Sequence, residues 1–300
     1  MKACKQLVWV TAFMAAGLVE AVACEPLVAA INAFNANDEQ AASAAYGAFQ
    51  TVNCAPEDKV MAGRFVSLLA FNRISSSVST GDSLEKHTIE LEALRDRFGG
   101  PWQVLDALGD VYRERKEYAK AARWYQSALV DADNPRLTPD WMAPNEDYIR
   151  RMDKLATEMQ LAAPVREMVS LLRNGCQIAY RGVALKKKTT PIRFVFGTAD
   201  FTPEGEKAAQ DLSECLKSAK PKAVTLIGHT DPVGSEQSNL RLSVQRAETL
   251  SRYLAAAGYS GTLKVEGRGE SDPFQPDDPT AYDEETMNQL QRRVEADLEK

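Results

Sequence analysis

The hydrophobic positions change their period near residue 190, and this change divides the chain into two regions. Before it, apolar residues recur every three or four positions, the spacing of one face of a helix. The pattern is seen in EPLVAAINAF, EQAASAAYGAFQTV, KVMAGRFVSLLAF and SLEKHTIELEALRDRF. The runs NAND, CAPED, SSSVSTGD and GGP are typical of turns and separate these segments. We therefore predict an all-helical region over residues 24–163.

One helix pair in this region has a more specific pattern. Its spacing resembles the tetratricopeptide repeat at Leu108, Gly109, Tyr112, Ala121, Tyr125 and Ala128, with Pro135 two places later than in the consensus. A single repeat cannot bury its own faces, so the resemblance implies an α-solenoid with helical neighbours and a capping helix in NEDYIRRMDKLATEMQL. Such a stack usually offers a concave surface to a protein partner. A generic helical bundle is the alternative.

After residue 190, segments of period two alternate with segments of helical period. PIRFVFGT, KAVTLIGH, TLKVEGRG and RRVEADLE read as strands. One predicted helix begins at Thr202 and Pro203, and a second runs from a Ser235 cap to Gly258. This alternation favours a two-layer α/β domain over residues 191–300. Residues 164–190 are expected to form an irregular linker, with Lys186 to Lys188 as a solvated run.

Composition and the N-terminus narrow the class of protein. The 300 residues are 44% apolar and carry a net charge of −6, which allows two packed domains and gives no overall attraction to nucleic acid. MKACKQ, a short apolar run and AVA at residues 21–23 have the layout of a secretory signal peptide over residues 1–23. A buried N-terminal helix is the alternative. No later run approaches the roughly 20 apolar residues of a membrane helix, so the mature chain is expected to be exported without a transmembrane segment.

The cysteines fit an oxidising compartment. Cys4 would leave with the signal peptide, and the remaining four are an even number, which predicts two disulfides. Proximity along the chain favours Cys24–Cys54 and Cys176–Cys215 among the three pairings. Cys24 also lies where a bacterial lipoprotein carries its lipid, so a lipid anchor there is the competing interpretation, although AVA is a poor lipobox.

Candidate chemistry concentrates around GHTD at residues 228–231. Asp231 would lie at a strand end beside a helix N-terminus, where α/β folds usually place ligand sites. Asn239 and Arg246 are seven residues apart and would share a stripe of that helix. An acid and a fork-shaped cation across one crevice suit a zwitterion, with Asp231 for an ammonium and Arg246 for a carboxylate. The alternatives are an Asp231–Arg246 salt bridge or two solvated charges.

An enzymatic interpretation has little support in the sequence. His229, Asp231 and Ser235 could form a hydrolase triad only if their side chains converged, and no nucleophile elbow or second nearby histidine accompanies them. The only other histidine, His87, lies in the helical region. We expect His229 to be a packed strand residue, and we expect no catalytic residue, metal site or cofactor.

These residues also carry a family resemblance. Thr230-Asp231, ten residues, Leu242-Ser243, two residues and Arg246-Ala247 resemble the motif of OmpA-like peptidoglycan-binding domains, which also occur in peptidoglycan-associated lipoproteins and flagellar stator proteins. GRGESDP at residues 267–273 and QRRVE at residues 291–295 resemble two later motifs of the family, with Gln291 where asparagine is usual. The resemblance covers residues 190–300 and implies an α/β fold with a mixed sheet.

The resemblance implies binding without catalysis. Family domains hold the diaminopimelate of peptidoglycan stems, and the matching residues here are Asp231 and Arg246, with Asn239 and Arg292 carried over from the same motifs. We therefore expect an exported protein in the periplasm or cell envelope of a Gram-negative-type bacterium, in soluble form or associated with the outer membrane. Its helices would recruit a protein partner while its C-terminal domain holds the wall. The alternative is a periplasmic scaffold whose OmpA-like domain does not bind wall.

Overall fold

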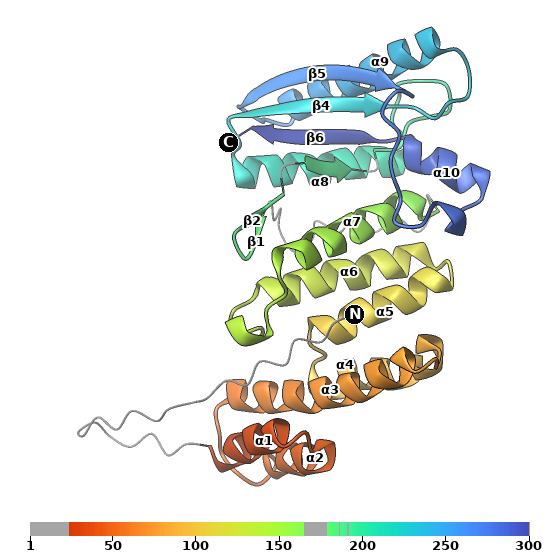
Figure 1. Ribbon diagram of the computed structural model, residues 1–300. Helices are drawn as coiled ribbons and strands as arrows, with labels where there is room; N and C mark the ends of the chain where they lie inside the picture. Colours follow the sequence, from red (N-terminus) through yellow and green to blue (C-terminus); the bar gives the residue numbers. More distant parts are fainter. Residues whose placement is uncertain (1–23, 165–178, 186, 191, 300) are drawn as a thin grey trace.

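The computed structural model describes residues 24–164, 179–185, 187–190 and 192–299 (Figure 1). The predicted signal peptide, residues 1–23, and Cys176 lie outside these residues. Within them, a stack of helices is followed by an α/β domain, as the sequence predicts. Among the described helices, none combines the length and the apolar character that crossing a membrane requires.

The N-terminal region is helical throughout. Its helices begin at good caps where the sequence supplies them: the side chain of Asp38 accepts from Ala41 N, and that of Asn145 accepts from Tyr148 N. The elements are α1 Glu25–Asn35, α2 Glu39–Ala48, α3 Pro56–Ser79, η1 Leu84–His87, α4 Thr88–Phe98, α5 Trp102–Glu114, α6 Tyr118–Asp133, η2 Asp140–Met142 and α7 Glu146–Ala162.

Helices α5 and α6 pack closely against each other, as the small residues Gly109 and Ala121 suggest. A Cβ on Gly109 would lie 2.6 Å from the Tyr125 ring, so only glycine permits this contact. Leu108, Ala121 and Tyr125 are fully buried in the same core cluster. The structure is consistent with a helical repeat here, while the tetratricopeptide assignment remains a prediction.

A buried ion pair connects three of the helices. Arg64 on α3 donates to both carboxylate oxygens of Asp131 on α6, at 2.9 and 2.5 Å. Asp131 also accepts from the backbone N–H of Trp102, the first residue of α5, at 2.9 Å. Arg64 is 2% exposed and Asp131 8%. The carboxylate therefore holds α3, the start of α5 and the end of α6 together.

The C-terminal domain contains a four-stranded sheet, in the order β3-β6-β4-β5, among the residues described. The strands are β3 Lys187–Thr190, β4 Ala223–His229, β5 Thr262–Gly269 and β6 Val294–Glu299. β4 and β5 are parallel, whereas β6 runs antiparallel to both β4 and β3, so the sheet is mixed as predicted. Helices α8 Pro203–Ala219 and α9 Glu236–Ala256 share one hydrophobic core with the sheet. The short helix α10 Glu284–Gln291 precedes β6.

Three local expectations were wrong. The expected strand at residues 191–198 is reduced to one isolated bridge between Phe194 and Phe201, and Phe196 is 83% exposed. The expected linker contains the hairpin β1 Ala179–Tyr180 and β2 Val183–Ala184, and then β3. The serine-rich run expected to end a helix is instead the last part of α3, because Ile74 and Val78 pack into the main helical core.

The two regions contact each other directly. Leu161 and Ala162 at the end of α7 pack against Leu290 of α10. The buried carboxylate of Glu158 accepts from Tyr282 Oη at 2.5 Å and from Asp277 N at 2.8 Å. The α/β domain is therefore attached to the helical stack by a packed interface (Figure 1).

The disulfide Cys24–Cys54 is present and joins the start of α1 to the loop before α3. This confirms the first predicted pairing, and a sulfur in this bond cannot also carry a lipid. Cys215 is likewise disulfide-bonded. Because Cys176 lies outside the described residues, the predicted Cys176–Cys215 pairing stays a prediction.

Candidate functional site

The GHTD stretch ends β4 and leads into α9. His229 is the last residue of the strand, Asp231 follows in the loop, and Ser235 caps the helix by accepting from Ser238 N. Asp231 is buried to all but 7% of its surface. The predicted placement of the acid between a strand end and a helix N-terminus is therefore observed.

Glycines in two motifs set the distance between α9 and the sheet. A Cβ on Gly228 would lie 2.1 Å from Ser243 O, and one on Gly267 would lie 2.6 Å from Ser243 Oγ. The same hydroxyl accepts from Gly269 N at 2.9 Å. Larger residues would push the helix away. The close contact explains why the polar part of α9, with Asn239 and Arg246, faces inward rather than toward solvent.

Asp231 is paired with Arg292 and not with Arg246. Its Oδ2 accepts from Arg292 Nη1 at 2.8 Å, and its Oδ1 accepts from Val233 N at 3.1 Å. The other terminal nitrogen of Arg292 donates to Glu285 at 2.7 Å. Among the described residues, Asp231 forms its salt bridge with Arg292, so the alternative of an Asp231–Arg246 salt bridge was wrong.

Asn239 on α9 is hydrogen-bonded to the loop that contains Asp231. Its side-chain amide donates to the backbone carbonyl of Asp231 at 3.2 Å and to Glu270 Oε2 at 2.5 Å. Since both hydrogen bonds are made within the protein, Asn239 positions Asp231 in this structure. Glu270 lies in the GRGESDP motif, so the sequence indicated that this residue could belong to the site. It did not show that Glu270 would contact Asn239.

Arg246 is a buried cation whose side chain is only partly bonded. Its Nε donates to Thr198 O at 3.0 Å, and its guanidinium lies 5.1 Å from the centre of the Phe194 ring. Within the described residues, its two terminal nitrogens have no hydrogen-bond partner. Burial, together with the charge of Arg292, lowers the pKa of Arg246 to about 10, although Asp231 acts in the opposite direction. Such a group favours an added anion.

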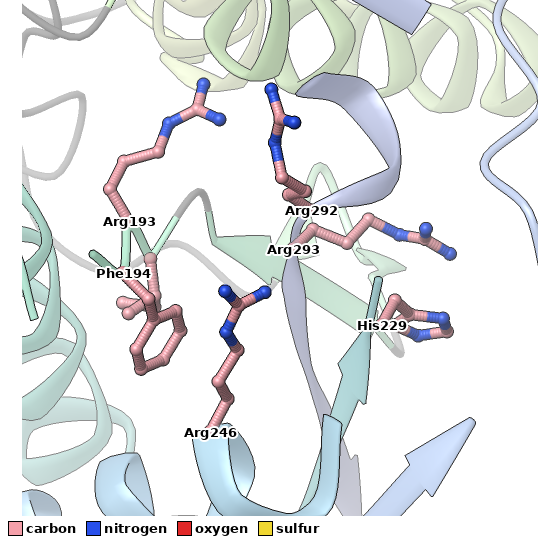
Figure 2. Close-up of a pocket in the computed structure, with 7 residues that line it drawn as sticks. Arg193, Phe194, His229, Arg246, Arg292 and Arg293 are labelled. Carbon is pink, nitrogen blue, oxygen red and sulfur yellow. The ribbon is translucent and has the colours of Figure 1, made fainter. Parts of the chain in front are cut away.

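Arg246 and Arg292 line a small pocket of about 40 Å³, whereas Asp231 and Asn239 are not among its lining residues (Figure 2). Arg246 reaches the pocket from α9, while Arg292 enters from the segment after α10. Arg293 is already neutralised, because its Nε donates to Glu295 at 2.9 Å. The lining residues are Ile192, Arg193, Phe194, His229, Arg246, Arg292 and Arg293. Sequence reasoning missed Arg193, Phe194 and Thr198, which precede the motif by more than thirty residues.

His229 and Gln291 have structural positions. His229 is 1% exposed, and burial, then the charge of Arg293, lowers its pKa to about 4, so it is neutral near pH 7. It is a packed strand residue, as expected. The side chain of Gln291, which stands where the family usually has asparagine, accepts from Phe274 N at 2.6 Å and so holds the loop that precedes α10.

Comparison with known proteins identifies the α/β region. Residues 193–286 match the OmpA family. The C-terminal region is an OmpA domain. Outer membrane protein A of Shimwellia blattae is 39% identical over 85 residues, which are 27% of this chain and 35% of that protein. The Klebsiella pneumoniae protein of the same name is 35% identical over 100 residues, 32% of this chain and 28% of that protein. The chain thus spans about a third of the length of these curated relatives.

Solved structures of similar proteins match the same part of the chain. The peptidoglycan-associated lipoprotein from Burkholderia pseudomallei is 26% identical, covering 38% of this chain and 90% of that one, with a TM-score of 0.30. The cell wall anchor of the T6SS from Pseudomonas aeruginosa is 24% identical, covering 38% and 80%, with a TM-score of 0.31. The OmpA family, which residues 193–286 match, is a structural and peptidoglycan-binding family rather than a family of enzymes.

Proposed function

We propose that the OmpA domain binds peptidoglycan non-covalently by holding the diaminopimelate of peptide stems between Asp231 and Arg246. The observation that carries this proposal is the guanidinium of Arg246, which is buried, lacks an acidic partner among the described residues and turns unbonded terminal nitrogens toward a pocket. A carboxylate on that guanidinium would form the bidentate pair that arginine favours.

Asp231 can receive the ammonium of the same ligand without losing its present contacts. Each of its oxygens accepts one hydrogen bond in the structure, from Val233 N and from Arg292. A carboxylate oxygen has capacity for a second acceptor interaction, so an ammonium can be added. Arg292 then orients the acid, and Asn239 holds the backbone of the same residue.

The affinity expected for one stem is modest. A hydrogen bond to a charged group contributes roughly 1.5–3 kcal/mol. Two such anchors, less the ordering cost of binding, give a dissociation constant on the order of micromolar to millimolar. Because a wall polymer presents many stems, several bound domains in one assembly would be retained much longer than one domain.

Sedimentation with purified sacculi tests the proposal. The wild-type chain should pellet with sacculi, while Asp231→Ala and Arg246→Ala should stay in the supernatant. Arg252→Ala is the matched control, because Arg252 is exposed on the same helix and, within the described part of the chain, bonds only Thr249. If both site variants pellet as well as the control, the site assignment is wrong. If the wild-type chain itself does not pellet, the domain belongs to a scaffold that does not bind wall.

A comparison of stems tests the ligand chemistry. A diaminopimelate stem ends its side chain in an ammonium and a carboxylate, whereas a lysine stem ends in an ammonium alone. Removing the carboxylate deprives Arg246 of its partner, so the lysine stem should bind roughly 10- to 100-fold more weakly. Equal binding of the two peptides would contradict a role for Arg246 in holding the carboxylate.

We also propose that the helical region recruits a protein partner in the cell envelope. Its stacked helices and the α5–α6 pair are consistent with a repeat module of the kind that binds proteins. Crosslinking in envelope fractions, followed by mass spectrometry, should yield crosslinks to another protein that map to residues 24–163. Crosslinks confined to the OmpA domain would contradict this part of the proposal.

A further inference from the structure

The pocket contains a second buried cation that the family motif does not include. Arg193 lies just before Phe194 and is 6% exposed. Its Nη2 donates to the backbone carbonyl of Leu161 at 2.6 Å, and its Nε is buried without a hydrogen-bond partner. Among the described residues it has no acidic partner. A guanidinium removed from water without a counter-charge is unfavourable, because the lost hydration is not replaced by an ion pair.

Arg193 and Arg246 are both buried guanidinium groups without an acidic partner among the described residues, and both lie on the same pocket. Each donates to a backbone carbonyl and to no other group among the residues described, and both line the cavity together with Arg292 (Figure 2). Among the described residues, two acids bond any of these three arginines, Asp231 and Glu285, and both bond Arg292. One ligand carboxylate on Arg246 would still leave Arg193 without an anion.

We infer that the pocket binds a stem through two carboxylates, one on Arg246 and a second on Arg193. This rests on the proposed binding of diaminopimelate. The second carboxylate is the other one of the same diamino diacid, which is free when that residue ends the stem and is amide-bonded when alanine follows. The pocket would therefore prefer stems that end at diaminopimelate. Arg193 is then a specificity residue.

The position of Arg193 also allows a purely structural role. Its bond to Leu161 O attaches the OmpA domain to the end of α7. Gln289 makes the same kind of attachment, since its side-chain amide donates to Leu161 O at 2.7 Å and to Ala163 O at 2.9 Å. Gln289 does not line the pocket. Gln289→Ala is therefore a matched control that weakens the attachment and leaves the cationic pocket intact.

Calorimetry with two synthetic tripeptides separates the possibilities. The first stem ends in diaminopimelate with both carboxylates free, and the second has the terminal carboxylate capped as an amide. The wild-type chain should bind the acid roughly 10- to 100-fold more tightly than the amide. Arg193→Gln should lose this preference while binding the amide as the wild type does, and Gln289→Ala should keep the preference.

The outcomes identify which statement fails. A wild-type chain that binds both peptides equally, or an Arg193→Gln variant that keeps the full preference, overturns the second carboxylate site while the proposed function stands. A wild-type chain that binds neither peptide overturns both. If Arg193→Gln does not fold, Arg193→Lys takes its place, because a retained positive charge should retain a reduced preference for the acid; an unchanged preference would overturn the site.

Discussion

Removing the carboxylate of Asp131 should destabilise the helical stack strongly. Asp131→Ala leaves the guanidinium of Arg64, 2% exposed, without its counter-ion and leaves the backbone N–H of Trp102 without its acceptor. Breaking a buried pair from one side typically costs 3–5 kcal/mol, and an orphaned buried donor costs about 1–3 kcal/mol. Since the two terms overlap, we expect a loss of about 3–5 kcal/mol, a large part of the stability of a domain.

A double variant distinguishes the buried charge from simple loss of contacts. The double variant Arg64→Met with Asp131→Ala also removes the Arg64 guanidinium, so no unpaired charge is left. Of the hydrogen bonds described above, only that of the Trp102 N–H is then without its acceptor. The double variant should therefore be more stable than Asp131→Ala alone, with a net loss of about 2 kcal/mol. The surface pair of Arg73 and Glu39 is the control; their side chains are 50% and 38% exposed, so Glu39→Ala should cost less than about 1 kcal/mol.

Urea unfolding of the full chain, followed by far-ultraviolet circular dichroism, measures these changes, because the helical region supplies most of the signal. The reasoning is refuted if Asp131→Ala shifts the transition no more than Glu39→Ala does. It is also refuted if the double variant is as unstable as the sum of the two single variants.

Three further predictions concern the disulfide and the GHTD stretch. Replacing Cys24 and Cys54, which are 30 residues apart, should cost about 3.5 kcal/mol and lower the thermal midpoint of the helical region, whereas an unchanged midpoint would mean that the bond adds no stability. Because His229 is neutral in the folded state with a pKa of about 4, the unfolded chain takes up a proton first as the pH falls below about 6.5. Stability should therefore be full above about pH 6.5 and fall by about 3 kcal/mol toward pH 4, and His229→Gln should flatten this dependence in denaturation curves. Gly228→Ala should abolish pelleting with sacculi, since its Cβ would meet Ser243 O at 2.1 Å, whereas Gly47→Ala, with no atom within 4 Å, should pellet normally.

Patterns within one element were predictable from sequence. The alternation of β4 and the Ser235 cap of α9 are local properties, and both elements are observed. Asp231 lies in the loop between β4 and α9, as the sequence indicated. The sequence put Asn239 and Arg246 on one stripe of α9, but it did not show that this stripe is buried. A period alone could not locate the strand near residue 190, because Ile192 and Phe194 are inward while Phe196 lies in a turn and is exposed.

Contacts between distant elements were not predictable. Asp231 and Arg292 are 61 residues apart, and their pairing depends on where β6 joins the sheet. Arg193 carried no motif, so its burial beside Arg246 could be seen only after the chain was folded. The continuation of α3 beyond Ile74 has the same origin, because tertiary packing overrides the weak helix preference of serine.

The packed interface between α7 and α10 has a mechanical consequence. A flexible tether would let a wall-bound domain and its partner-binding helices move independently, and tension would first extend the tether. Here Glu158 bonds Tyr282 and Asp277 directly, and Leu161 packs on Leu290, so force passes through side chains of both regions. Under the proposed function, a partner bound by the helices would keep a fixed position relative to the wall, and a force on that partner would be transmitted directly to the bound stem.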